Sequence, residues 1–446
     1  MSQVTKSKKS DLNTAFTDNF SQFVQELSAN APLSNVRQKA IEHFASVGLP
    51  SGKAEEYKYT PIARALEKHF TERDTLPAND PLSSEAESGV RQFLLNTDAN
   101  HLVFVNGRYH EELSVIVSPE DELRVCPLGE AYKQYAQVID RYFSSEATIE
   151  SDPFVALNTA YAQGGVFVHT PKSKTVKHPV ICYFISDTAS QSIMAHPRNL
   201  FVVEENAHVK FAEIFHTIGE GASYNNAVTE IIIDRYAHVH YYKYENESTQ
   251  AYHTGTTQVK QQDNSHFHAV NISLQGAMIR NNLNIALDAE HCESHMYGLY
   301  MLDGNTHVDN HTVVDHQKPN AFSNELYKGI INDKARGVFN GKIYVRQDAQ
   351  KTNAFQSNAN ILLSDDASVD TKPQLEIWAD DVKCSHGATT GQIDQEQLFY
   401  LRTRGLTKIQ ARAVLLKAFA GDVIQHIGID ALREKIEAQI SERLEQ

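Results

Sequence analysis

The chain has 446 residues, of which 41% are hydrophobic and 22% are charged, and its formal net charge is −15. This length allows two or three structural units around a large core, and the composition is typical of a soluble globular protein. The negative charge argues against a nucleic-acid partner, because binding to phosphates relies on Lys and Arg. No apolar run approaches the roughly 20 residues of a membrane-spanning helix, so we expect no membrane contact.

The first residues, MSQVTKSKKSDLNTAF, lack the apolar core of a secretory signal and the arginines of an organelle transit peptide. We therefore expect a cytoplasmic protein. The cysteines are widely spaced and form no CxxC pair, which argues against a zinc ribbon or a disulfide scaffold and favours reduced thiols. They are Cys126, Cys182, Cys292 and Cys384.

Residues 1–95 are predicted to form an N-terminal helical domain with a linker. A first helix is indicated by apolar residues that recur at spacings of three and four: Phe16, Phe20, Phe23 and Leu27. A second helix is predicted to begin near Ser34 and to end at Gly48. The polar, proline-containing stretch 77–89 is interpreted as a loop.

The stretch GLPSGKAEEYKYTP (48–61) contains a Gly-Lys pair and invites comparison with a phosphate-binding loop. Only three residues separate Gly48 from Gly52, where the motif has four, and Ala54 stands where the motif has a metal-binding Ser or Thr. We reject a nucleotide site here.

Residues 96–391 are predicted to form a strand-rich core. Short apolar runs such as GVFVHT, NLFVVEE and TEIIID recur from about residue 100 to 390, with no long helical pattern between them. The segments NAHVKF, YAHVHY and NSHFHA form a weak repeat whose central small residues are Ala207, Ala237 and Ser265. We read EHCES (290–294) as the next copy.

Two further segments, KARGVF (334–339) and DASVDT (366–371), are interpreted as later copies, and PNAFSN (319–324) is echoed 33 residues on by TNAFQSN. A period of 25–33 residues built from short strands is typical of a stacked solenoid, here a parallel β-helix. A propeller needs a longer period, whereas a β-sandwich stays open as an alternative.

Residues 392–446 are predicted to form a C-terminal helical domain. One helix (394–405) is closed by Gly405, and Thr407 with Gln410 predicts a capping box for the next. The apolar stripe of that second helix is expected to comprise Ile409, Ala413, Leu416 and Ala420. A third helix carries a seam of residues four apart, which predicts packing against another helix, in this chain or in a partner: Leu432, Ile436, Ile440 and Leu444.

Ten of the 21 histidines lie between His238 and His316. His307, Asp309 and His311 alternate along a predicted strand and would share one face, which makes them a candidate zinc or iron site. The alternative is that stacked turns place polar side chains in ladders without a metal. Because several ligands must converge on one point, we favour the second interpretation.

The acid pairs in LLSDDASVD (362–370) and WADDV (378–382) allow a third interpretation, a carbohydrate-active β-helix with two carboxylates in a groove. Aspartates are equally favoured in turns, and such enzymes are normally secreted. We therefore rank this interpretation low.

The stretch KCSHGAT (383–389) places Cys384 and His386 two apart, hence on one face of an extended segment. They could act jointly as thiolate and imidazole donors, and Lys383 is expected to lower the pKa of the thiol. Two donors cannot close a tetrahedral site, so any metal needs ligands from elsewhere. The alternative is a buried cysteine and a hydrogen-bonded histidine that end the last strand.

From Gln374 to Ile424 the sequence, which includes WADDVKCSHGATTGQ and LTKIQARAVLLKAFAGDVI, resembles the SufB/SufD family of iron–sulfur cluster assembly proteins. The similarity is greatest to the SufD branch, and GLPSGKAEEYKYT resembles the family's N-terminal signature. The resemblance implies a right-handed parallel β-helix between two helical regions.

The resemblance also implies a non-catalytic subunit that pairs with SufB through the end of its β-helix and with the ATPase SufC through its C-terminal helices. His386, and Cys384 after it, match the motif positions associated with the nascent cluster. The residues expected to dock the partner lie in the C-terminal helices: Tyr400, Arg402, Arg404, Gly405, Ala411, Leu415 and Phe419. SufB-like sequences carry glutamates beside the motif histidine, whereas Ser385 and Gly387 stand here.

We therefore expect no tightly bound cofactor in the chain alone, a transient iron–sulfur cluster or iron in the complex, and a role in iron acquisition. The resemblance leaves room for FAD in the complex and for a homodimer of the isolated chain. Two alternatives stay open: a purely structural adaptor without ligand role, and a stand-alone metal-dependent or carbohydrate-active β-helix enzyme.

Overall fold

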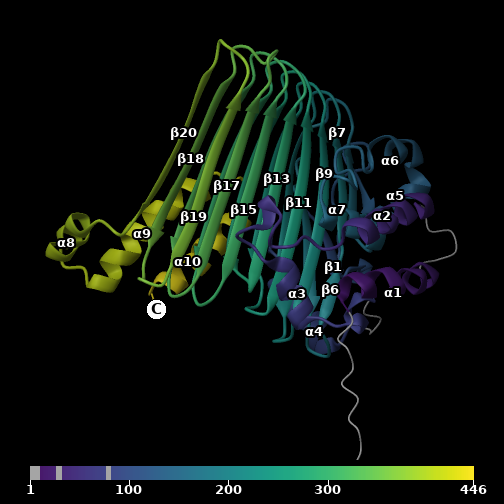
Figure 1. The fold of residues 1–446 in the computed structure, drawn as a ribbon, viewed down its shortest axis with the longest axis horizontal. Helices are drawn as coiled ribbons and strands as arrows, with labels where there is room; N and C mark the ends of the chain where they lie inside the picture. Colours follow the sequence, from purple (N-terminus) through teal and green to yellow (C-terminus); the bar gives the residue numbers. More distant parts are fainter. Residues whose placement is uncertain (1–10, 27–32, 77–81, 446) are drawn as a thin grey trace, which may run out of the picture.

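Figure 1 shows a computed structural model of the chain, which describes residues 11–26, 33–76 and 82–445. The strands form a parallel β-solenoid of about eight turns with helices at both ends, so the β-helix prediction is confirmed. The predicted helix position Leu27 lies outside the described residues.

Two sheets, A and B, form the walls of the solenoid. In spatial order sheet A comprises β2 (Arg108–Tyr109), β1 (Asn100–Val105), β5 (Val180–Asp187), β8 (His208–Ile218), β10 (His238–Asn246), β12 (His266–Gln275), β14 (Glu293–Leu302), β16 (Phe322–Ile331), β18 (Asn353–Leu362) and β20 (Lys383–Gly391). Sheet B comprises β19 (Ser368–Ile377), β17 (Arg336–Val345), β15 (His307–His316), β13 (Met278–Leu287), β11 (Ala251–Gln261), β9 (Ser223–Ile233), β7 (Arg198–Val203), β4 (Val166–Thr170) and β3 (Arg124–Pro127), with β6 (Ile193–Ala195) beside β9.

From β8 onward the chain alternates between the two sheets, so that each turn adds one parallel strand to each. This alternation rules out the β-sandwich alternative. The first strands differ, because β1 pairs with β2 and β3 pairs with β4 in antiparallel fashion. The solenoid is thus closed by antiparallel pairs at its N-terminal end.

The tight turns before the strands of sheet A explain the sequence repeat. A residue with positive φ stands two positions before each strand from β8 to β18: Asn206, Tyr236, Asn264, His291, Asn320 and Lys351. The next residue is small and buried, as Ala207, Ala237 and Ser265 are. Cys292 fills the same position and is 1% exposed, so its role is that of a small core residue.

Two of the predicted copies of the repeat lie in sheet B and not in sheet A. KARGVF and DASVDT open β17 and β19, which lie in sheet B, so they continue the turn pattern of the opposite wall. The echo of PNAFSN in TNAFQSN is also out of register by two residues, because Phe322 pairs with Asn353, 31 residues on. An offset of two keeps the same side chains facing inward, which is why the sequence tolerates it.

The N-terminal helices pack on the solenoid near its closed end (Figure 1). They are α1 (Leu12–Glu26), α2 (Ser34–Val47), α3 (Ile62–His69) and α4 (Ser84–Phe93), with short 3-10 turns η1 (Glu55–Tyr57) and η2 (Glu72–Thr75). The loop prediction for 77–89 is wrong at its end, because the Ser83 hydroxyl accepts a hydrogen bond from the Ala86 N–H at 3.1 Å and caps α4.

Short helices also interrupt the region that we expected to contain strands alone. A 3-10 turn, η3 (Glu111–Leu113), is followed by α5 (Leu128–Gln134), α6 (Ala136–Tyr142) and α7 (Pro153–Tyr161). α7 shares a hydrophobic cluster with α1 and α2, in which Phe16 and Phe44 lie with Tyr161. Its residues from Phe154 to Tyr161 are all buried, so it lacks the polar face by which an amphipathic helix is detected.

The C-terminal helices are α8 (Gln395–Thr403), α9 (Lys408–Ile424) and α10 (Asp430–Glu445), and the Thr407–Gln410 capping box is confirmed. The seam of α10 is not free, because Leu432, Ile436 and Ile440 are buried in one cluster with α9 and the outer face of sheet A. Ile409 lies outside the covered stripe of α9 and is 56% exposed. No helix in the described ranges is long and apolar enough to cross a membrane.

Candidate functional site at the open end of the solenoid

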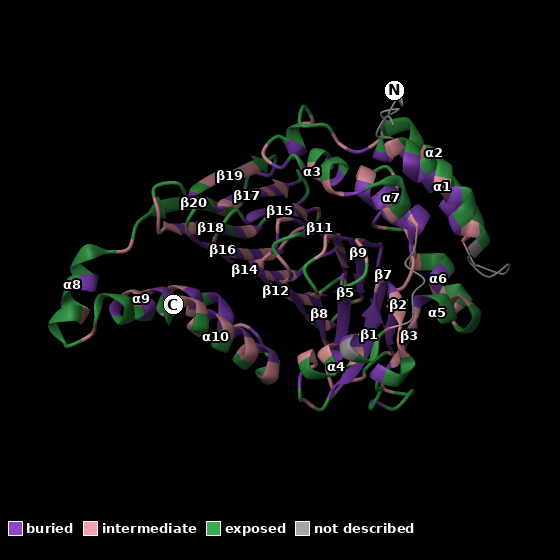
Figure 2. Cartoon of the chain, turned by 90° about the horizontal axis from the view of Figure 1, so that it is seen from below, coloured by how far each residue is buried: buried purple, intermediate pink, exposed green. Residues whose placement is uncertain are grey.

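The C-terminal end of the solenoid is open. β20 pairs with β18 and β19 with β17, and among the described residues no strand pairs with their outer edges. The β20 residues are almost all exposed, whereas alternate residues of β18 are buried. Figure 2 shows β20 largely in the colour of exposed residues, together with α8. The interior of the last turn therefore faces solvent.

Cys384 and His386 occupy inward-facing positions of this last turn. Cys384 is paired with Ala354 and His386 with Gln356, and both β18 residues are buried. The structure thus brings the two predicted residues onto one face, as their spacing predicts. The Gln356 side chain donates a hydrogen bond to Glu325 at 2.8 Å, and its own Oε1 atom is buried without a hydrogen-bond partner.

The two donors differ in exposure. Cys384 is half-buried and packs against the solenoid core, whereas His386 is exposed. Burial raises the pKa of the Cys384 thiol above its ordinary value. The predicted lowering by Lys383 is therefore wrong: Lys383 is exposed, and solvent screens its charge.

Among the described residues, no group of three or more His, Cys, Asp or Glu side chains is arranged to hold a metal ion. The remaining cysteines are buried, and burial raises the thiol pKa of Cys126 to about 12 and of Cys292 to about 11. Two donors do not close a tetrahedral site, so any metal held by His386 and Cys384 needs further donors.

His307, Asp309 and His311 do lie together on β15, but they bind other side chains. Arg280 donates hydrogen bonds to Asp309 at 2.8 Å and forms an ion pair with it that is almost fully buried. Thr60 contacts His307 at 3.0 Å and donates a hydrogen bond to Asp309. His307, Asp309 and His311 thus have structural partners in place of a metal. Residues 55–60, which we call the strap, lie outside the solenoid and contribute Thr60 to these contacts. We call the contacts of Asp309 with Arg280 and Thr60 the lock.

The acid pairs that suggested a carbohydrate-active enzyme lie in turns. Asp365 and Asp366 are exposed between β18 and β19, and Asp380 and Asp381 are exposed between β19 and β20. The geometry agrees with the turn interpretation, in which Asp is favoured for local hydrogen bonding.

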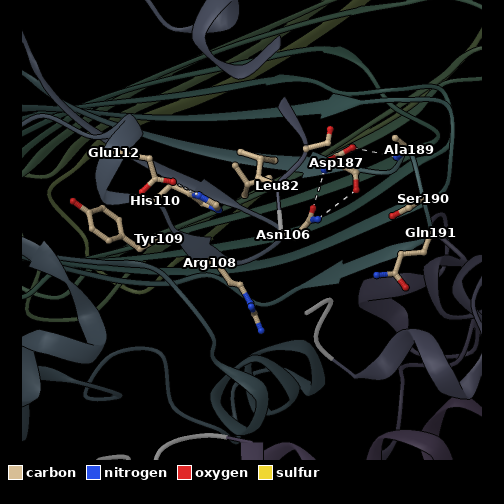
Figure 3. A pocket seen from close by; sticks show the side chains of 12 residues that line it. Leu82, Asn106, Arg108, Tyr109, His110, Glu112, Asp187, Ala189, Ser190 and Gln191 are labelled. Atoms are coloured by element: carbon tan, nitrogen blue, oxygen red, sulfur yellow. Dashed lines mark hydrogen bonds and ion pairs between the residues drawn. The ribbon is translucent and has the colours of Figure 1, made fainter. Parts of the chain in front are cut away.

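A cavity of about 560 Å³ lies at the opposite, closed end, near β1, β2 and β5 (Figure 3). Asn106 holds its turn together by accepting a hydrogen bond from the Asp187 N–H at 2.8 Å, and His110 contacts Glu112 at 3.0 Å. The cavity is separate from Cys384 and His386, which stand on β20 at the other end of the solenoid.

The predicted partner-docking residues fall into two groups. Tyr400, Arg402, Arg404 and Gly405 are exposed on α8 and the turn after it. Ala411 is fully buried, and Leu415 and Phe419 are half-buried against this chain. The Phe419 ring lies 4.2 Å from the Lys328 ammonium. The first group is accessible from solvent, whereas Ala411 is covered by this chain and Leu415 and Phe419 are only partly accessible.

Sequence reasoning missed three exposed apolar residues beside that first group. Phe399, Ile409 and Val414 are 67%, 56% and 46% exposed. Exposed apolar clusters of this kind mark interaction surfaces. We call Phe399, Tyr400, Ile409 and Val414 the α8–α9 patch. The spacing of Ile409 matches the apolar stripe of α9, so periodicity alone could not indicate that its side chain is exposed.

The chain is thus a parallel β-solenoid protein whose last strand carries the half-buried Cys384 and the exposed His386, and whose helices α8 and α9 expose apolar side chains. The region 184–419 matches the model of the SUF system FeS cluster assembly SufBD core domain, and residues 7–181 match the SufBD protein N-terminal region. The chain belongs to the SufBD family.

Named relatives agree with this assignment. The chain is 31% identical over 417 residues to an iron–sulfur cluster assembly SufBD family protein of Synechocystis, covering 92% of this chain and 90% of the relative. It is 30% identical to the iron–sulfur cluster assembly protein SufD of Escherichia coli, covering 91% and 92%. It is 23% identical to SufD of Bacillus subtilis, covering 99% and 100%.

Proposed function

We propose that this chain is a non-catalytic, SufD-type subunit of a SUF complex. In this proposal its open end joins a SufB-type subunit, its C-terminal helices dock an ATPase of the SufC type, and His386 with Cys384 lends ligands to a transient cluster that forms between the subunits. The observation that carries the proposal is the exposed interior of the last turn, which holds two donors and too few neighbours to complete a metal site.

The open edges of β19 and β20 suit a partner that continues the sheets, because unpaired backbone groups accept an added strand. A second solenoid stacked on this end would cover the half-exposed interior and place its own ligands opposite His386. The same edges would also serve a homodimer of the isolated chain. The cluster and its iron are cargo in this proposal, which leaves room for FAD in the complex.

Movement of the ATPase offers a way to open that junction. The α8–α9 patch is exposed, whereas α10 and the inner face of α9 pack on sheet A. A partner bound to the patch therefore pulls on helices that are anchored to the solenoid, and hinge motions of this kind gate other sites. Iron acquisition would follow from exposure of the ligands during each cycle.

Selective loss of each partner tests the two surfaces separately. Ala388→Glu places a charge in the exposed inward face of β20 and is expected to reduce capture of the SufB-type subunit at least tenfold, with the ATPase retained. The double variant Phe399→Ser, Ile409→Ser is expected to reduce capture of the ATPase and to retain the SufB-type subunit. The measurement is co-purification of the three chains, with Glu437→Gln on the exposed face of α10 as the control.

Loss of both partners in both variants, or of neither, would contradict the assignment of the surfaces. Removal of all residues after Gly391 is less informative, because it would uncover apolar residues of sheet A such as Val270, Ile272 and Leu299. The point variants leave that packing intact.

A second candidate, a structural adaptor without ligand role, has one observation in its favour. The raised pKa of Cys384 lowers its thiolate fraction at neutral pH, and the thiolate is the metal ligand. The two candidates differ in their prediction for a variant that lacks both donors: an adaptor still supports cluster build-up.

A further inference from the structure

Histidines cover part of the outer face of sheet A, far from β20 along the solenoid. Two columns of side chains run across neighbouring strands in register, on the face opposite to core residues such as Val239 and Phe267. We call them the histidine grid. The first column comprises His208, His238, His266 and Glu293, and the second Lys210, His240, His268 and His295.

The imidazole rings of the grid lie close together. His208 stacks on His238, and His238 on His266, with ring centroids 4.3 Å apart in both pairs. His268 lies 5.0 Å from His240 and 5.8 Å from His426, which follows α9.

The Nδ1 atoms of His240 and His268 are buried without a hydrogen-bond partner. Neutral imidazole nitrogens are the form of histidine that binds transition metals.

At one edge of the grid a carboxylate joins two imidazoles. Glu293 contacts His295 Nε2 at 2.6 Å through one oxygen and His266 Nδ1 at 3.3 Å through the other. The three side chains are 40%, 29% and 42% exposed, so an ion can reach them from solvent. Two histidines and one carboxylate are the donor set that suits Fe²⁺ and similar divalent ions.

We propose that His266, Glu293 and His295 form a binding site for a divalent transition-metal ion on the outer face of sheet A. Water completes the coordination sphere of the ion. The site is separate from the cluster ligands at the open end, and its identification with iron rests on the proposed role in cluster assembly.

The donor atoms of His266, Glu293 and His295 lie near one another but do not converge on a common point. Among the described residues no three such donors are already arranged as a metal site. Their partial exposure leaves the side chains free to change rotamer, a motion that exposed side chains make within nanoseconds. An ion would replace the contacts between Glu293 and the two rings by bonds to all three side chains.

Cobalt titration of the purified full-length chain under reducing, anaerobic conditions tests the proposal, because Co²⁺ resembles Fe²⁺ in ligand preference and its visible absorption reports on coordination. We expect one Co²⁺ per chain at pH 7.5. Glu293→Gln and His295→Gln should each weaken binding about tenfold or more. His208→Gln, in the same grid but away from Glu293, should leave it within about twofold.

Millimolar Ca²⁺ or Mg²⁺ should not compete, since these ions prefer all-oxygen sites. Equal binding in the wild-type chain, Glu293→Gln and His295→Gln would overturn the proposal, and so would the absence of Co²⁺ binding to a folded wild-type chain. His386→Ala is expected to retain the Co²⁺ site. Failure at the grid can therefore be distinguished from failure of the cluster-ligand assignment, which is read from cluster build-up on the complex.

Discussion

Glu325 is a carboxyl group inside the solenoid, two strands before the last strand of sheet A, β20. It is 1% exposed and lies on β16, where its Oε2 atom accepts a hydrogen bond from Gln356. Burial raises its pKa to about 7, more than its hydrogen bonds to Thr312 and Gln356 lower it. Its ionised form is therefore disfavoured in the folded chain.

Because the folded pKa lies above the ordinary value of 4.5, the stability associated with Glu325 is complete below pH 4.5 and is lost as the pH rises to about 7. Glu325→Gln removes this loss. We compare the free energy of unfolding of the variant with that of the wild type at each pH. We expect this difference to be about 3 kcal/mol more favourable to the variant at pH 8 than at pH 4.5. Urea unfolding at both pH values measures it, with the exposed Glu437→Gln as control.

A pH-independent difference between Glu325→Gln and wild type would show that the carboxyl group is solvated. Partial burial in the last turn also explains why the pKa of the Cys384 thiol is raised although Lys383 is its neighbour in the sequence. The sequence places Lys383 next to the thiol but cannot indicate that the solenoid core packs against Cys384, so the direction of that pKa shift could not be predicted.

At the scale of elements, the strap binds the N-terminal region to sheet B. The Arg280 guanidinium lies 4.3 Å from the Tyr57 ring and donates a hydrogen bond to the Glu56 carbonyl at 2.6 Å. Lys342 and Lys372, on β17 and β19, form ion pairs with Glu56 and Glu55 at 2.6 and 2.8 Å. The strap thus spans sheet B from β13 to β19.

Asp309→Asn tests the lock beneath the strap. Burial raises the pKa of Asp309, but the charges of His311 and Arg280 outweigh it and hold the pKa well below its usual range. Its stabilising effect is therefore present above the ordinary value of 3.8 and is lost on acidification below it. The variant leaves Arg280 buried without a counter-charge, and we expect a loss of about 3 kcal/mol at pH 7 in urea unfolding.

Glu55→Gln, which removes an exposed ion pair of the same strap, is the matched control and should have a much smaller effect. If both variants unfolded at the same urea concentration, the strap would be held by its surface pairs and not by the buried lock.

The elements also mark the limit of sequence reasoning. The solenoid could be predicted because the turns before the strands of sheet A repeat a small buried residue, as at Ala207, Ala237 and Ser265. The sequence could not indicate that the turn with Ala335, in KARGVF, leads into sheet B, since the turns of both sheets use the same kind of residue. The ligand interpretation of His307 and Asp309 failed because their partner Thr60 is almost 250 residues away in the chain.

At the scale of the whole molecule, the two ends of the solenoid differ in kind. Antiparallel pairs close the N-terminal end, whereas the C-terminal end exposes β20 with its donors. The position of KCSHGAT on the last strand and its shared face could be predicted from spacing and resemblance. The openness of that end depends on where the stacking stops, which no local pattern indicates.

The most direct test of this account is cluster build-up on the reconstituted three-component complex with His386→Ala in this chain, followed by the absorption of the cluster under anaerobic conditions. Ser385→Ala, whose side chain belongs to the opposite face of β20, is the control. We predict that His386→Ala, in a complex of unchanged composition, loses most of the cluster and that Ser385→Ala retains it. An undiminished cluster in the chain that lacks both His386 and Cys384 would contradict the ligand role and leave the adaptor.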